Sequence, residues 1–307
     1  MSAAAVMSMS PLLRLPAEIR NKIFEYALTS PRPLHHRQPR TKFSPMAPTA
    51  SHRHRLVEEK DMVKAKKGHR SSINRLKLVC RQLYAETAGL EIRFNAIVFS
   101  PQKLSPFQSS PHLPASEGKY FKAAEQWFLD FVAPMTPNKL QWLSTVIIAS
   151  GVDCLTMIQP KAPPMPDLPS LAMFCKQHPH IDIRYQFPNF GFDCDIYPSS
   201  LNFLSAGVCL VTALKGDRAG AKARDALLNT NTWVQIGYEE AQHWREVWNI
   251  QYLFKDIKNF TIMPTAHMDP SLLTLRGDAE NLHITETQWI EWQLYSSSWL
   301  QHGISGA

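Results

Sequence analysis

Residues 15–26, which read LPAEIRNKIFEY, decide the fold of the N-terminal part because they carry a clear helical period. Pro16 suits a first helical turn, where its missing N–H costs nothing, and Glu18 lies near the positive end of the helix dipole. One side of this helix is polar: Glu18, Asn21, Lys22 and Glu25. The opposite side is apolar: Ile19, Ile23, Phe24, Ala27 and Leu28. The spacing predicts a helix over 12–28 with one buried apolar face.

A second stretch, LKLVCRQLY at residues 76–84, carries the same kind of period. Its apolar positions recur at helical spacing: Leu76, Val79, Cys80, Leu83 and Thr87. We therefore expect a helix over 73–90. It leads into residues 96–99, whose β-branched and aromatic side chains predict a short strand.

These two blocks resemble an F-box motif. Residues 15–24 are similar to its opening, L-P-x-E-I-x-x-x-I-F, and residues 76–81 are similar to its L-x-L-V-C-R segment. The wider pattern, with LVCRQLYAE at 78–86 and Asn95 before a strand, resembles a large fungal family with a degenerate F-box-like N-terminus and no established activity. The resemblance covers residues 12–28 and 73–99.

The resemblance implies an adaptor, in which the F-box-like helices bind a Skp-family linker protein of a cullin ubiquitin ligase and the rest recruits an unknown protein substrate. Helix-in-groove binding of this kind requires an apolar helix face with a polar rim. Carried over by position, the residues that contact the linker are Leu15, Pro16, Ile19, Ile23, Val79, Cys80 and Tyr84. The alternative is a non-catalytic scaffold in which the F-box-like helices are a structural remnant covered by the chain itself.

The two F-box-like blocks are separated by residues 29–72, where an F-box has a short turn. The net charge of +7 is concentrated here, because residues 31–77 hold 13 Lys and Arg against 3 Asp and Glu. Interleaved prolines, histidines and cations predict a disordered basic insert. An alternative function follows from it: a nuclear protein that associates with nucleic acid through a basic patch, non-specifically because the patch lacks base-reading aromatics. The patch comprises Arg53, Arg55, Lys64, Lys66, Lys67 and Arg70.

The larger part, residues 115–307, alternates helical and strand patterns, so the fold class is expected to be α+β. We expect strands at 144–149, 181–187 and 259–263, and helices at 119–132, 171–177, 200–214, 219–228, 239–254 and 286–300. The domain boundaries are 11–99 for the F-box-like region and 115–307 for the mixed domain of unknown function. The sequence leaves open whether these two parts pack as one unit.

The chain lacks the residue patterns of common catalytic sites. Its 12 glycines form no phosphate-binding loop, and its 5 cysteines show no C-x-x-C spacing that would suggest zinc. The insert histidines His35, His36, His52 and His54 have no nearby cysteine or carboxylate pair to complete a metal site. We therefore expect no enzyme activity, no catalytic residue, no metal, no cofactor and no membrane association. The cysteines are odd in number and far apart in the sequence, which is typical of reduced thiols and indicates a cytoplasmic or nuclear protein.

Overall fold

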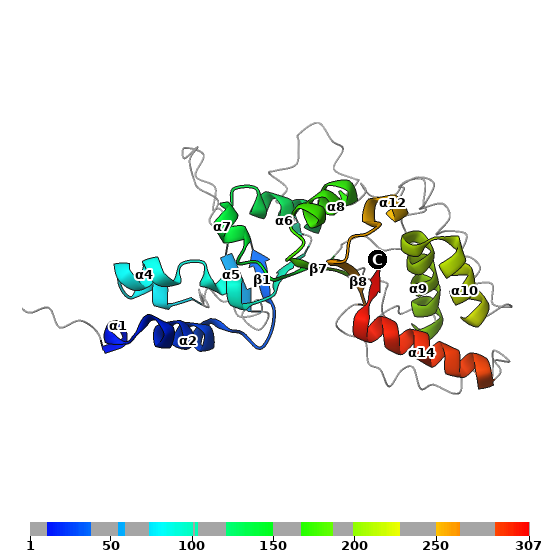
Figure 1. Ribbon diagram of the computed structural model, residues 1–307, viewed down its shortest axis with the longest axis horizontal. Helices are drawn as coiled ribbons and strands as arrows, with labels where there is room; N and C mark the ends of the chain where they lie inside the picture. Colours follow the sequence, from blue (N-terminus) through cyan, green and yellow to red (C-terminus); the bar gives the residue numbers. More distant parts are fainter. Residues whose placement is uncertain are drawn as a thin grey trace, which may run out of the picture. The chain divides into compact units, whose positions relative to one another are not determined.

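The computed structural model describes residues 11–37, 55–58, 74–100, 102–103, 121–149, 167–186, 199–227, 250–264 and 286–306, which form helices and a mixed sheet (Figure 1). The α+β fold class predicted from the sequence is thereby confirmed. The chain divides into two compact units. Unit 1 comprises Met1–Ile97 with Thr136–Ser144, and unit 2 comprises Val98–Met135 with Thr145–Ala307. Each is described below by itself.

Unit 1 begins with two helices, α1 (Pro11–Arg14) and α2 (Ala17–Leu28), where the sequence predicted one. The break falls at Leu15 and Pro16. Proline disfavours helical backbone at the residue before it and supplies no N–H to the preceding turn, so Pro16 starts a new helix as its N-cap.

The predicted helix over 73–90 is also interrupted. The structure has a 3-10 turn, η2 (Leu76–Leu78), then α4 (Arg81–Thr87) and α5 (Leu90–Phe94). Cys80 is extended, with φ −155° and ψ 166°, and its Sγ accepts the Leu83 N–H as the N-cap of α4. Gly89 separates α4 from α5 with φ +92°, a conformation that favours glycine. Unit 1 also contains the short helix α7 (Pro137–Leu140).

Two ranges of the basic insert form strands, which differs from the prediction of an insert without regular structure. Strand β1 (Leu34–Arg37) pairs antiparallel with β2 (Arg55–Glu58), and Leu34 lies opposite Glu58. Leu34 is fully buried and its N–H donates to the Ala96 carbonyl at 2.9 Å. Burial of this leucine accounts for order that composition alone did not indicate. Residues 29–33, which lead from α2 to β1, are also described, whereas residues 38–54 and 59–72 lie outside the described ranges.

The sheet of unit 2 has the order β3-β6-β7-β8-β9. Its strands are β3 (Ile97–Phe99), β6 (Thr145–Ala149), β7 (Asp182–Gln186), β8 (Phe260–Met263) and β9 (Ile304–Ser305). β6, β7 and β8 are parallel, and β9 runs antiparallel to β8. The four strands predicted from the sequence at 96–99, 144–149, 181–187 and 259–263 are confirmed. A separate pair joins β4 (Gln102–Lys103) to β5 (Phe121–Lys122).

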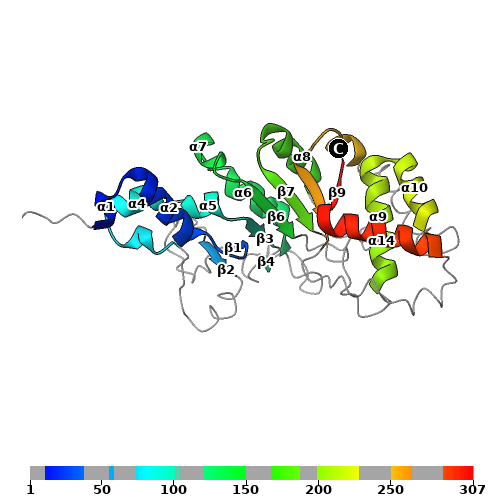
Figure 2. The same ribbon diagram turned by 60° about the horizontal axis from the view of Figure 1, so that its bottom comes forward.

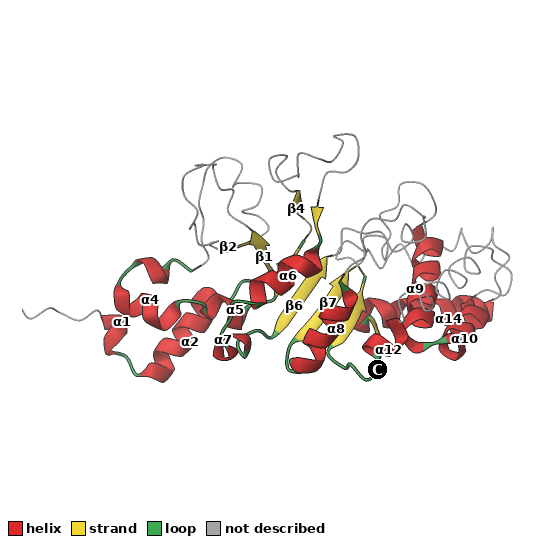
Figure 3. Cartoon of the chain, turned by 90° about the horizontal axis from the view of Figure 1, so that it is seen from above, coloured by secondary structure: helices red, strands yellow, loops and turns green. Residues whose placement is uncertain are grey.

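Helices surround this sheet. Helices α6 (Ala124–Val132) and α8 (Leu168–Gln177) lie over the β6 and β7 strands (Figure 3), where Phe99, Phe128 and Phe174 make edge-to-face ring contacts. Helices α9 (Ser199–Lys215), α10 (Asp217–Leu227) and α14 (Glu286–His302) group near the β8 and β9 strands (Figure 2), and α12 (Ile250–Phe254) precedes β8. Of the predicted helix over 239–254, only this last part is described.

Candidate docking surface

Helix α2 has two apolar faces. Phe24 and Leu28 are each only 1% exposed, whereas Ile19 is 45% and Ile23 is 38% exposed. The prediction that these four residues and Ala27 share one buried face is therefore wrong for Ile19, Ile23 and Ala27. One apolar face of the helix holds the unit together, and the other meets solvent.

The exposed face is a continuous line of side chains. At about 100° per residue, Pro16, Ile19, Ile23 and Tyr26 fall along one side of α2, with spacings of three, four and three residues. We call these four residues the apolar stripe. All four are exposed, and Tyr26 reaches 90%. Tyr26 was not among the residues predicted to contact a linker, although its position seven residues after Ile19 places it on the same side of the helix.

The buried face of α2 supports the stripe through a small core. Phe24 and Leu28 pack with Leu83 of α4 and Leu90 of α5, and partly buried side chains surround them: Leu12, Leu13, Leu76 and Phe94. Fully burying a side chain of this kind stabilises a fold by roughly 1.5–3 kcal/mol. None of these residues belongs to the stripe, so the fold of unit 1 does not depend on covering it.

Arg20 fixes the start of α2. Its Nε forms an ion pair with Glu86 of α4 at 3.2 Å, and its Nη1 donates to the carbonyls of Leu13 and Leu15 at 3.2 and 2.8 Å. Leu15 is only partly exposed, unlike the other residues predicted to contact a linker. The guanidinium thus ties the chain before Pro16 to α4 and sets the angle at which α2 begins.

Asn95 fixes the other end of α2. Its Nδ2 donates to the carbonyls of Leu28 and Glu91, both at 2.8 Å, and its Oδ1 accepts the Ser30 N–H at 2.6 Å. Asn95 is buried. A single amide therefore satisfies a carbonyl at the end of α2 and anchors the following chain, which a helix end requires when it is not solvated.

The second predicted segment is held by a buried polar network. Nδ2 of the fully buried Asn74 donates to the Thr87 carbonyl at 2.7 Å and to Glu91 at 2.8 Å, and Glu91 also pairs with Lys77 at 3.3 Å. These contacts fix both ends of the η2–α4 turn. The chain that they support presents its own apolar side chains to solvent.

The exposed side chains of this turn are large. Leu78 is 75% exposed, Val79 67% and Tyr84 57%, and the Cys80 thiol is also exposed. Of the seven residues predicted to contact a linker, six are therefore exposed: Pro16, Ile19, Ile23, Val79, Cys80 and Tyr84. Leu78 is a further exposed residue, which was not among the seven predicted from the resemblance to the F-box motif.

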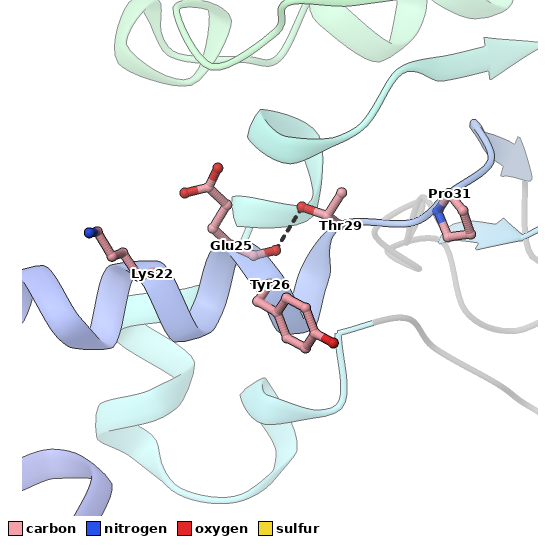
Figure 4. A pocket seen from close by; sticks show the side chains of 5 residues that line it. All are labelled: Lys22, Glu25, Tyr26, Thr29 and Pro31. Atoms are coloured by element: carbon pink, nitrogen blue, oxygen red, sulfur yellow. Dashed lines mark hydrogen bonds between the residues drawn. The ribbon is translucent and has the colours of Figure 1, made fainter.

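A shallow hollow of about 470 Å³ lies beside the last turn of α2 (Figure 4). Lys22 and Glu25 project from the helix in one direction and Tyr26 in another, and the Thr29 hydroxyl donates to the Glu25 carbonyl at 2.7 Å. Pro31 completes the lining. The hollow is large enough for a side chain of a partner that reaches past Tyr26.

The basic patch lies almost entirely outside the described residues. Arg55 is placed in β2, opposite Arg37 of β1. The other members of the patch, Arg53, Lys64, Lys66, Lys67 and Arg70, are not among the described residues, and neither are His52 and His54. The structure therefore brings no set of these cations together into a described surface.

The described part of unit 2 contains buried ionisable groups. Glu125 of α6 accepts a hydrogen bond from the Tyr185 hydroxyl of β7, and burial raises the pKa of the Glu125 carboxyl, although that hydrogen bond opposes the shift. Burial also raises the pKa of the Cys175 thiol to about 12, so this sulfur is a poor nucleophile at neutral pH. Within the described ranges, no three His, Cys, Asp or Glu side chains gather around a potential metal position. Nor is any described helix long and apolar enough to cross a bilayer.

Comparison of the chain with family models, curated proteins and solved structures finds no match to any of them.

Proposed function

We propose that the chain is an F-box-like protein-interaction adaptor that binds a Skp-family linker through the apolar stripe of α2 and the exposed residues Val79, Cys80 and Tyr84. In this role it is a substrate-recruiting subunit of a cullin ubiquitin ligase, and its partner proteins catalyse the ubiquitination of the substrate. The observation that carries the proposal is that Ile19 and Ile23 are exposed while Phe24 and Leu28 stabilise the unit.

The exposed apolar area supplies a driving force for binding. Covering the 45% of Ile19 and the 38% of Ile23 that remain exposed contributes about 1 kcal/mol for each residue, if full burial is worth about 2–3 kcal/mol. Tyr26 and Tyr84 add aromatic side chains of the type that is enriched at the centres of interfaces. Arg20 and Asn95 hold α2 at both ends, so little conformational freedom remains to be lost on binding.

The scaffold alternative predicts a different environment for the apolar residues of α2. If the F-box-like helices were only a structural remnant, large apolar side chains on α2 would be expected to serve the core. Ile19 and Ile23 contribute far less to that core than Phe24, which is almost completely buried. The basic-patch alternative rests on the charge of residues 31–77, and no described contact adds to it.

The proposal is tested by measuring binding of the full chain to a Skp-family linker. We expect binding at micromolar concentration or tighter, and a loss of at least tenfold in Ile19→Asp, which places a charge in the stripe. Asn21→Asp is the matched control, because it adds the same charge to the same helix at an exposed position away from the stripe. Absence of binding by the wild-type chain, or equal losses in both variants, would refute the proposal.

The basic-patch alternative is separated by a second variant in which Lys64, Lys66 and Lys67 are changed to Gln. This variant leaves Leu34 and the β1–β2 pair in place, whereas deletion of the insert would remove a buried side chain. Linker binding should be unchanged in the triple variant. Loss of linker binding in it would assign the interaction to the insert instead of α2.

A further inference from the structure

The charges around the apolar stripe do not balance. Residues 11–29 and 74–97 hold seven cations, Arg14, Arg20, Lys22, Arg75, Lys77, Arg81 and Arg93, against four carboxylates, Glu18, Glu25, Glu86 and Glu91. This is an excess of three positive charges over the two segments that build the docking surface. Two of the seven, Arg75 and Lys77, belong to the basic range 31–77, and the other five lie outside it.

Internal ion pairs use two of the four carboxylates. Glu86 pairs with Arg20 at 3.2 Å, and Glu91 pairs with Lys77 at 3.3 Å. Both pairs are partly buried, so these carboxylates are committed to holding the helices together. Five cations are left in these segments without an ion pair to a described residue, against Glu18 and Glu25.

Lys22 lies closest to the stripe among these free charges. On a helix that turns by about 100° per residue, Lys22 borders the stripe on one side and Arg20 borders it on the other. Glu18 and Glu25 lie further round the helix from the stripe. In the second segment, Arg81 lies one turn before the exposed Tyr84. Each apolar segment is therefore flanked by a cation that has no ion pair to a described residue.

We propose that the partner surface that covers the apolar stripe is acidic, with apolar side chains against Ile19 and Ile23 and flanking carboxylates against Lys22 and Arg81. This inference rests on the proposed function and specifies the chemistry of its partner. Opposite charges at the rim of an interface accelerate association more than they strengthen the final complex. Attraction between the two surfaces thus sets the association rate, and apolar burial sets the lifetime of the complex.

Two other occupants fit these observations less well. A second copy of the chain would meet this surface with the same excess of positive charge, because a symmetric dimer pairs one patch with itself. A nucleic acid would meet the cations, but its phosphates gain nothing from the exposed Ile19 and Ile23. An acidic protein surface with an apolar centre matches both features.

The test is the association rate constant of the full chain with a Skp-family linker, measured at several salt concentrations. At low salt we expect Lys22→Glu and Arg81→Glu each to slow association by about three- to tenfold. Glu25→Lys, one turn away from Lys22 on the same exposed helix, should accelerate it by about two- to threefold. These differences should vanish at high salt, because mobile ions screen exposed charges.

The inference fails separately from the proposed function. Salt-independent association, or equal rates for Lys22→Glu and Glu25→Lys, would overturn the acidic partner surface even if the linker binds through Ile19. Dimerisation of the chain through the stripe would also overturn it, and so would a DNA duplex that binds in place of the linker and is lost in Lys22→Glu. Circular dichroism of each variant verifies that its helices are retained.

Discussion

Phe24 and Ile23 are neighbours in the sequence and lie on different faces of α2, so truncating each one to alanine separates the two roles of this helix. Phe24 is 1% exposed and packs with Leu28, Leu83 and Leu90. Phe24→Ala removes a fully buried ring and leaves a cavity, which costs about 3–5 kcal/mol. Ile23 is 38% exposed, so Ile23→Ala loses only part of its burial and should cost about 1 kcal/mol.

The difference is measurable as local opening of unit 1. Hydrogen exchange of the α2 amides should accelerate by at least a hundredfold in Phe24→Ala and by about fivefold in Ile23→Ala, since every 1.4 kcal/mol is a factor of ten. Urea unfolding of both variants, followed by circular dichroism, gives the global effect. Similar acceleration in the two variants would refute the division of α2 into a supporting face and an exposed face.

Three further substitutions test other parts of the structure. Asn95→Ala should destabilise unit 1 by about 2–4 kcal/mol in urea unfolding, because the buried Leu28 carbonyl and the partly buried Ser30 N–H lose their partner. Asn21→Ala should change stability by less than about 0.5 kcal/mol. Glu125→Gln should gain stability relative to the wild type as the pH rises above 4.5, because burial raises the pKa of the Glu125 carboxyl in the folded wild type and so disfavours its ionisation there. A stability difference between variant and wild type that stays constant from about pH 5 to pH 8 would contradict this. Gly207→Ala should lower the melting temperature by several degrees, because its Cβ would overlap the Trp299 ring; an unchanged value would show that α9 and α14 separate easily.

The strands of unit 2 were the most predictable part of the fold. Residues 145–149 and 182–186 alternate or continue β-branched and apolar side chains over a length typical of strands, and both pair in the parallel sheet. The helices of unit 2 that the structure describes were also predicted, although α6 begins at Ala124 and not at residue 119, and only residues 250–254 of the helix expected over 239–254 are described. The order of the strands in the sheet could not be predicted from the sequence, because it depends on contacts between segments far apart in the chain.

Helix breaks were the least predictable part. Cys80 has no strong preference for the extended backbone that interrupts 73–90; in the structure its Sγ accepts the Leu83 N–H at the start of α4. Leu34 could not be recognised as a buried residue among prolines and cations, because its burial depends on pairing with Ala96. Tertiary contacts decide both cases.

The candidate surface was predicted in part. Motif positions identified Ile19, Ile23, Val79 and Tyr84, but the helical period alone placed Ile19 and Ile23 on the same face as Phe24. A helix with apolar residues on more than half of its circumference has two possible buried faces, and periodicity does not choose between them. The choice is made by contacts with the second segment, namely with Leu83 and Leu90 and through the ion pair of Arg20 with Glu86.

The central claim is that the stripe on α2 is an apolar docking surface, and calorimetric titration of the full chain with a Skp-family linker at several temperatures tests it most directly. Burial of apolar surface gives a negative heat-capacity change on binding. We predict binding at micromolar concentration or tighter with such a change, and loss of binding in Ile19→Asp with its helical content intact. Absence of binding heat at every temperature, or unchanged binding by Ile19→Asp, would contradict the claim.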